Sequence, residues 1–141
     1  IDQYFKQYPG IRDYMEVTKA QAREKGYVET IFGRRCHIPG IADKNPARRQ
    51  FGERQSINAP LQGSAADIIK RAMIAVEIAI KEAGSEAALL LQVHDELVFE
   101  VKQGEEEQAL HLIKPAMEHA AHLSVPLLVE TGFGTHWGEA H

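Results

Sequence analysis

Two adjacent carboxylates, Asp95 and Glu96, stand between two runs of mostly apolar residues, 88–94 and 97–102. We predict that the two runs are strands of a hairpin that turns at the acidic pair. Two carboxylates at one tight turn repel each other unless a cation or a basic group lies beside them. Carboxylate oxygens are ligands that Mg²⁺ prefers, and Mg²⁺ usually keeps waters and substrate phosphates as further ligands. The pair could therefore supply half of a metal site; a solvent-facing acidic turn is the alternative.

The predicted turn has an unusual composition. A two-residue hairpin loop usually needs positive φ and therefore Gly or Asn, whereas this sequence supplies Asp95 and Glu96. Holding a non-glycine residue in that conformation costs on the order of 1 kcal/mol or more. Both faces of the two strands are largely apolar, so we expect the hairpin to lie in the interior of a domain.

A second set of polar residues, Arg54, Asn58 and Gln62, is spaced by four residues, which would line them up on one helix face. Pro60 makes this alignment approximate, because proline bends or ends a helix. All three side chains can donate hydrogen bonds, and every base pair presents acceptors in the DNA minor groove. Such donors could check the shape of base pairs in any sequence. An ordinary polar helix face is the alternative. Residues 63–66, which are all small, would let another backbone approach closely.

Charge is unevenly distributed along the chain. The net charge is −4, which by itself argues against a nucleic-acid binder. Residues 33–54, however, carry six Lys or Arg against two acids, and residues 85–141 carry two Lys against ten acids. A basic segment beside an acidic one suits a protein that binds a polyanion in one place and cations in another. The alternative is that both segments are solvated surface.

Hydrophobic periodicity and turn residues predict the elements that must position these side chains. The predicted helices are residues 1–25 with a break at Pro9-Gly10, residues 45–57, residues 61–83 after a bend or restart at Pro60, and residues 105–123. A hairpin is predicted at 27–39 around Gly33-Arg34, and a last strand at 126–131, in addition to the acidic hairpin. The fold class is therefore α+β, with antiparallel strands backed by long helices.

Composition limits the setting of the protein. The 141 residues, 44% of them hydrophobic, suffice for one domain or a fragment of a larger one. No apolar run approaches the roughly 20 residues of a membrane span, so we expect no membrane association. The single cysteine, Cys36, allows no internal disulfide and suits a reducing cytoplasm. Because the chain begins with Ile1, we expect it to be part of something longer.

Three blocks in one order resemble family A DNA polymerases. Residues 54–67 (RQSINAPLQGSAAD) resemble a family segment with Arg, Asn, Pro, Gln-Gly and Ala-Asp at these spacings. Residues 93–98 (VHDELV) resemble the third polymerase motif, which forms the palm hairpin. Residues 26–35 (GYVETIFGRR) resemble the stretch just after the fingers, and the tail from 125 looks like the natural end of a bacterial member. The resemblance covers essentially the whole chain.

The resemblance implies roles for the acidic hairpin. Asp95 would be a catalytic metal ligand in the palm, and Glu96 an accessory carboxylate near the primer end that contributes to the same metal site. His94 would lie close to the primer terminus and contact its backbone. Two Mg²⁺ ions are implied, shared with upstream residues that have no counterpart here.

The resemblance also implies a DNA-binding surface. Arg54, Asn58 and Gln62 would follow the minor-groove side of the primer–template duplex near the insertion site. Arg34 and Arg35 would contact phosphates, which adds salt sensitivity rather than sequence preference.

The implied protein is a bacterial DNA-directed DNA polymerase that acts in replication and repair in the cytoplasm, near the nucleoid. Residues 1–53 would belong to the fingers side and residues 54–141 to the palm. Its partners would be primer–template DNA, deoxynucleoside triphosphates and the rest of the polymerase chain. The first-motif Asp and the fingers Lys and Tyr have no counterpart, so we expect the segment alone to be inactive.

Two other functions fit parts of the pattern. A non-catalytic duplex-DNA-binding module would use the basic segment and the polar row. A small metal hydrolase would use His94, Asp95 and Glu96 as ligands, but adjacent strand residues point to opposite faces, so the three could not all bind one ion without a distorted turn.

Overall fold

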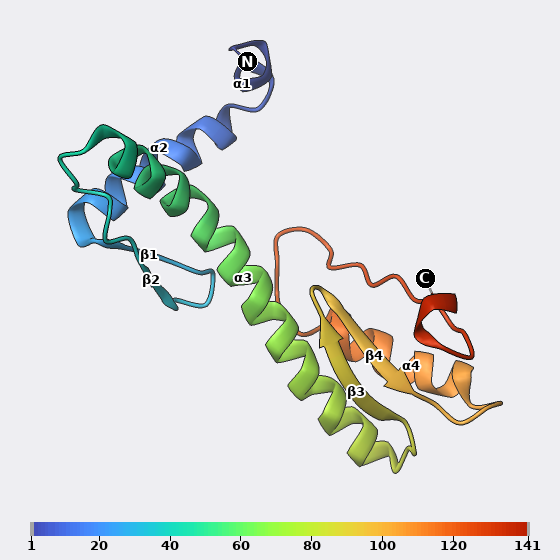
Figure 1. The fold of residues 1–141 in the computed structure, drawn as a ribbon. Coiled ribbons are helices and arrows are strands. Elements are labelled where there is room, and N and C mark those ends of the chain that lie inside the picture. Colours follow the sequence, from blue (N-terminus) through green and yellow to red (C-terminus); the bar gives the residue numbers. More distant parts are fainter. Residues whose placement is uncertain (1, 141) are drawn as a thin grey trace. The chain divides into compact units, whose positions relative to one another are not determined.

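The computed structural model describes residues 2–140, which form helices and two antiparallel hairpins (Figure 1). The predicted α+β class is therefore confirmed. The chain forms two compact units, residues 1–65 and 66–141, and one long helix, α3, contributes to both. The predicted division into fingers-side residues and palm residues at 53/54 stays a prediction.

The first unit begins with two helices, α1 (Asp2–Gln7) and α2 (Pro9–Lys25). They confirm the break predicted near Pro9-Gly10, which lies at Tyr8. Pro9 is suited to the first turn of a helix, where its missing N–H would have no helical partner. The helix α2 ends at Gly26, which adopts the left-handed conformation with φ 76° and donates its N–H to the Ala22 carbonyl at 2.8 Å. A glycine meets little steric cost there.

The predicted first hairpin is also confirmed. Its strands are β1 (Tyr27–Glu29) and β2 (Arg35–His37), paired antiparallel, with Gly33 at φ 80° in the turn. The hairpin closes a small core with α2 and the following loop. This core consists of buried Ala22, Val28, Ile38 and Ile41, with Cys36 and Ala59 packed against it.

The long helix α3 (Pro46–Ala83) is continuous over 38 residues. Asn45 caps its start, because the side-chain Oδ1 accepts the Ala47 N–H at 2.9 Å. Pro60 lies inside this helix, so the prediction of one helix ending near 57 and another starting after Pro60 is wrong. Side chains of α2 and the first hairpin contact α3 on either side of Pro60. Local sequence does not predict these contacts.

In the second unit, the hairpin of β3 (Ala88–Val93) and β4 (Glu96–Glu100) lies with α4 (Glu106–Glu118) and the C-terminal part of α3 (Figure 1). Val76, Ile80, Ala87 and Ala109 form the buried core. Side chains on one face of the hairpin, including Phe99, pack against it. A short helix, η1 (Trp137–Glu139), lies near the end of the chain.

The second hairpin differs from the predicted one in its register. Val93 pairs with Glu96, so the two-residue loop is His94-Asp95 rather than Asp95-Glu96. The register also shifts between Leu89 and Leu91, which makes Leu90 an extra residue in β3. Such a β-bulge exchanges the faces of the residues that follow it, so strict alternation along the sequence did not predict which side chains share a face.

The predicted last strand at 126–131 is wrong, because the described residues contain no strand there. A strand needs a neighbouring strand for its backbone groups, whereas the N–H of Val129 donates to Glu118 Oε1 at 3.1 Å. The preceding helix α4 contains Pro115 and ends at Glu118, earlier than the predicted residue 123. Among residues 2–140, no helix combines the length and apolar character that a membrane crossing requires.

Candidate functional site

The turn of the second hairpin carries three of the predicted site residues, His94, Asp95 and Glu96, and all three are exposed. His94 has φ 52° and is the one non-glycine residue with positive φ among residues 2–140. The predicted backbone strain therefore exists, but it lies one residue before the acidic pair. The side-chain amide of Gln92 donates to the His94 carbonyl at 2.9 Å, which ties the turn back to β3.

Asp95 ends this turn, and Glu96 is the first residue of β4. A carboxylate on a tight turn whose strands pair immediately below it is held more rigidly than one on a loop. Across residues 2–140, no group of three or more His, Cys, Asp or Glu side chains could hold a metal ion. Two neighbouring carboxylates are the right donors for a hard cation, but they form a partial ligand set.

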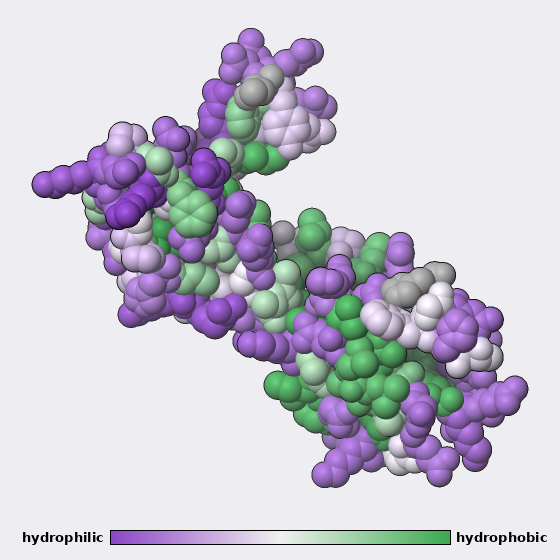
Figure 2. Space-filling view, in the orientation of Figure 1, coloured by the Kyte–Doolittle hydropathy of each residue, from purple (hydrophilic) through white to green (hydrophobic). Residues whose placement is uncertain are grey.

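The hairpin carries an apolar surface as well. Leu90 and Leu91 are 55% and 45% exposed, and Figure 2 shows apolar surface over β3 and β4. The hairpin was predicted to be an interior one, with both faces covered. In the described residues one face packs on the core and these two leucines remain accessible to solvent.

The polar row of Arg54, Asn58 and Gln62 lies in the first unit, on the exposed side of α3. Because α3 continues through Pro60, residues four apart follow each other along one face, shifted by about 40° at each step. Pro60 does not interrupt α3, so the structure supports the predicted alignment of Arg54, Asn58 and Gln62 on one helix face. In the same unit Arg34 reaches α3 one residue beyond Gln62, at the Gly63 carbonyl.

The opposite side of α3 is made of small residues, Gly52, Ser56, Ala59 and Gly63. Gly52 and Ser56 are buried, and Ser56 is fully inaccessible. A Cβ on Gly52 would lie 2.9 Å from backbone atoms of the loop at 40–41, and one on Gly63 would lie 2.8 Å from Thr30 Cγ2. At Gly63 the close neighbours are side-chain atoms of Thr30, Arg34 and Cys36, so the backbone approach predicted for residues 63–66 stays a prediction. This packing fixes which side of α3 faces outward.

Two side chains from outside the helix donate to carbonyls of α3. Tyr14 of α2 donates its hydroxyl to the Ile57 carbonyl at 2.8 Å, and Arg34 Nη2 donates to the Gly63 carbonyl at 3.1 Å. Burial raises the pKa of the Tyr14 hydroxyl, so it keeps its proton and remains a donor. Sequence reasoning missed Tyr14. The available signal was its place one residue before Met15 on the apolar side of α2, where a tyrosine needs a partner for its hydroxyl.

The two arginines of the first hairpin have different surroundings. Arg34 is exposed but hydrogen-bonded to α3. Arg35 lies over the ring of Tyr27, with its guanidinium carbon 4.7 Å from the ring centroid, and forms a 3.9 Å ion pair with Glu29. Its charge is therefore partly balanced within the hairpin.

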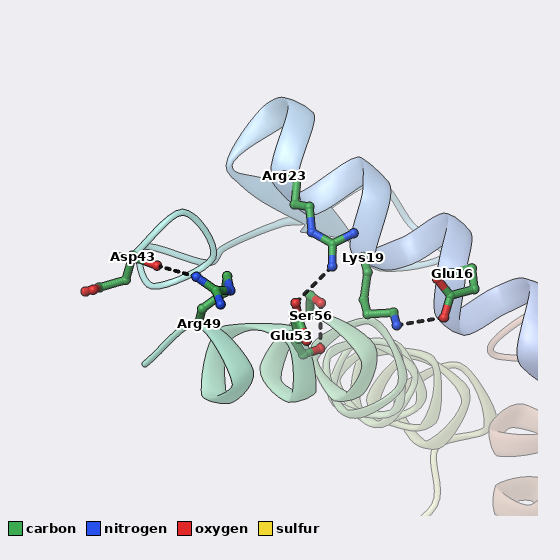
Figure 3. A network of polar contacts seen from close by, with 7 residues as sticks. All are labelled: Glu16, Lys19, Arg23, Asp43, Arg49, Glu53 and Ser56. Carbon is green, nitrogen blue, oxygen red and sulfur yellow. Dashed lines mark hydrogen bonds and ion pairs between the residues drawn. The ribbon is translucent and has the colours of Figure 1, made fainter. Parts of the chain in front are cut away.

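The basic segment is also partly paired inside the protein. Figure 3 shows the contact between α2 and the start of α3, where Arg23 and Glu53 form an ion pair at 2.9 Å. In the same region Arg49 Nη1 donates to the Asp43 carbonyl at 3.4 Å. Arg23 lies outside the segment 33–54, but within it Arg48 forms a 3.6 Å ion pair with Asp43, so the charge count along the sequence overstates what is available to a ligand.

A family model described as DNA polymerase family A matches residues 1–139. The chain belongs to DNA polymerase family A. It is 56% identical over its whole length to a DNA polymerase I of Pseudomonas aeruginosa and 54% identical over its whole length to one of Rhizobium leguminosarum. It spans 15% and 14% of the length of these curated relatives. The resemblance predicted from the three sequence blocks is confirmed.

A solved structure of a polymerase domain has the same fold as this chain. It is described as the POL domain of Pol1 from M. smegmatis in complex with DNA primer-template and dNTP. The TM-score is 0.94 at 48% identity, covering 99% of this chain and 24% of that one. The two hairpins and the helices of this chain thus match one portion of a polymerase domain.

Proposed function

We propose that this chain is the C-terminal part of the polymerase domain of a bacterial DNA-directed DNA polymerase. The whole protein would transfer deoxynucleotides to a primer 3′ end under the direction of a template, in replication and repair. The observation that carries the proposal is the exposed Asp95-Glu96 pair at a strained, hydrogen-bonded turn, within a match to the family along residues 1–139. Residues 1–53 would lie on the fingers side and residues 54–141 in the palm.

Asp95 would be a ligand of catalytic Mg²⁺, and Glu96 an accessory carboxylate of the same site. The donor set fits this role, because both side chains are exposed oxygen donors and the hairpin fixes the backbone that carries them. In a two-metal site, the ions stabilise the attacking and leaving oxygens of phosphoryl transfer. The remaining ligands would come from other parts of the polymerase, since two adjacent carboxylates leave the set incomplete.

The DNA surface would consist of the polar row together with the hairpin residues. Arg54, Asn58 and Gln62 would donate hydrogen bonds to minor-groove acceptors of the primer–template duplex. His94 would contact the primer terminus, and Arg34 and Arg35 would face phosphates. Exposure of these side chains supports the proposal, as does the M. smegmatis structure described with primer-template and dNTP. The site of action would be the bacterial cytoplasm, at the nucleoid.

The test is Asp95→Ala in the full-length protein that contains this segment. We expect single-nucleotide incorporation to fall by about a thousandfold or more, because a metal ligand contributes several kcal/mol of transition-state stabilisation. Primer–template affinity, measured by fluorescence anisotropy, should stay nearly unchanged. Glu100→Ala, which removes another exposed carboxylate of the same hairpin, is the matched control and should retain incorporation.

Normal incorporation by Asp95→Ala would contradict the metal-ligand role. A wild-type protein that binds primer–template DNA but incorporates no nucleotide would favour the duplex-binding module instead.

A further inference from the structure

The helix α3 continues through a residue that usually interrupts helices. Proline has no N–H to donate to the carbonyl four residues earlier, here that of Ser56, and its ring crowds that carbonyl. A proline in a helix interior costs about 3 kcal/mol relative to alanine. Nevertheless α3 extends from Pro46 to Ala83 with Pro60 inside. Something in the first unit must compensate for the weakened segment.

Support comes first from α2. The Tyr14 hydroxyl donates to the Ile57 carbonyl at 2.8 Å, three residues before Pro60, and this hydrogen bond is partly buried. A carbonyl oxygen has two lone pairs, so it can accept a side-chain donor besides a helical N–H. The bond joins residues 43 positions apart in the sequence and fixes α2 to α3 beside the proline.

Support comes second from the first hairpin, three residues after Pro60. Arg34 Nη2 donates to the Gly63 carbonyl at 3.1 Å, and Ser64 Oγ accepts the Ile31 N–H at 3.0 Å. A Cβ on Gly63 would lie 3.3 Å from Arg34 Nη2 and 2.8 Å from Thr30 Cγ2. Glycine at 63 therefore leaves room for the guanidinium and the hairpin loop.

The two supported carbonyls are next to residues of the polar row, since Ile57 precedes Asn58 and Gly63 follows Gln62. We propose that Tyr14 and Arg34 are positioning residues, which hold α3 straight through Pro60 so that Arg54, Asn58 and Gln62 stay in register on one face. This inference rests on the proposed function, in which that row contacts the primer–template duplex. Arg34 then acts through α3, and of the two arginines proposed above to face phosphates only Arg35 would keep that role.

The first test is Tyr14→Phe in the full-length protein, which removes the hydroxyl and keeps the ring. We expect the ratio of extension efficiency from matched over mismatched primer ends to rise about threefold to tenfold, the effect of one hydrogen bond. Gln62→Ala should change the ratio in the same direction. The double variant should match Gln62→Ala alone, because both substitutions act through the same row. Tyr8→Phe is the matched control, since Tyr8 is 48% exposed and its side chain makes a ring contact with Tyr4.

The second test separates positioning by Arg34 from phosphate contact. Loss of a phosphate contact lowers the slope of log affinity against log salt concentration by about one. We expect Arg34→Met to leave this slope unchanged and to raise the matched-to-mismatched ratio, as Tyr14→Phe does. A slope that falls by one with an unchanged ratio would overturn the positioning role of Arg34.

A third measurement does not depend on activity. Amide hydrogen exchange of residues 61–64 should be faster in Tyr14→Phe than in Tyr8→Phe, because the proline segment opens more often. Unchanged exchange, or additive effects in the double variant, would overturn the inference. Failure of the wild-type protein to extend any primer would contradict the proposed function instead, and the exchange result would still report on the support of α3.

Discussion

At the scale of single residues, His94 is the one non-glycine residue with positive φ among residues 2–140. Its backbone lies in the left-handed region, with φ 52°, and its side chain is a bulky ring that remains exposed. An L-residue other than glycine pays about 1–2 kcal/mol in that conformation. An exposed histidine ring on a strained backbone is explained if the ring serves a ligand, which agrees with the proposed contact to the primer terminus. The hydrogen bond from Gln92 to the His94 carbonyl holds the strained turn in place.

Substitution of His94 by glycine should therefore raise stability. Glycine removes the strain, although it loses about 0.5–1 kcal/mol of chain entropy on folding, so we expect a net gain of about 0.5 kcal/mol in the free energy of unfolding. Urea denaturation of the chain measures it. Asp95→Gly is the matched control, because φ of Asp95 is not positive, and it should lose about 0.5–1 kcal/mol. Equal effects of the two substitutions would argue against strain at His94.

At the scale of elements, α3 is defined by its two sides. Small residues on one side let the loop at 40–41 and the first hairpin approach its backbone, and the polar row occupies the other. The requirement for a small residue is strictest at Gly52. A Cβ there would lie 2.9 Å from the carbonyl carbon of Gly40 and from the backbone nitrogen of Ile41. Backbone atoms cannot move aside as the end of a flexible side chain can.

Gly52→Ala should destabilise the protein by about 1–2 kcal/mol, because overpacking against backbone outweighs the helix propensity that alanine gains. Thermal denaturation followed by circular dichroism measures the change. Gly10→Ala in α2 is the control, since nothing lies within 4 Å of its added Cβ, and it should be neutral or stabilising by up to about 1 kcal/mol. Stabilisation by Gly52→Ala would show that the loop at 40–41 can retreat.

At the scale of the whole molecule, the two kinds of site residue belong to different compact units. The polar row and both arginines lie in residues 1–65, and the acidic hairpin lies in residues 66–141. Asp95 and Glu96 form only part of a metal-ligand set. In the described residues, no third His, Cys, Asp or Glu joins them to complete a metal site. Catalysis would then need groups from other parts of the polymerase.

The 141-residue chain should accordingly bind Mg²⁺ weakly and incorporate no nucleotide. Isothermal titration calorimetry should detect no saturable site in the micromolar range, since Mg²⁺ dehydrates reluctantly and needs more than two carboxylates to bind tightly without substrate phosphates. Asp95→Ala should leave the titration unchanged. Tight, stoichiometric binding that is lost in this variant would instead favour the metal hydrolase built on His94, Asp95 and Glu96.

Features that depend on neighbouring residues were predictable from the sequence. Asn45 and Pro46 start α3, Gly26 ends α2, and Gly33 turns the first hairpin, because caps and turns are governed by the local backbone. The order of the motifs also determined the family.

The tertiary structure decided the rest. Pro60 remains helical in a segment to which Tyr14 and Arg34 donate hydrogen bonds across many residues, and the bulge at Leu90 sets which residues of the acidic hairpin face each other. Residues 126–131 form no strand, because pairing requires a partner that local sequence cannot supply. In each case the deciding group lies far away along the chain or on another strand, where propensity and periodicity carry no information.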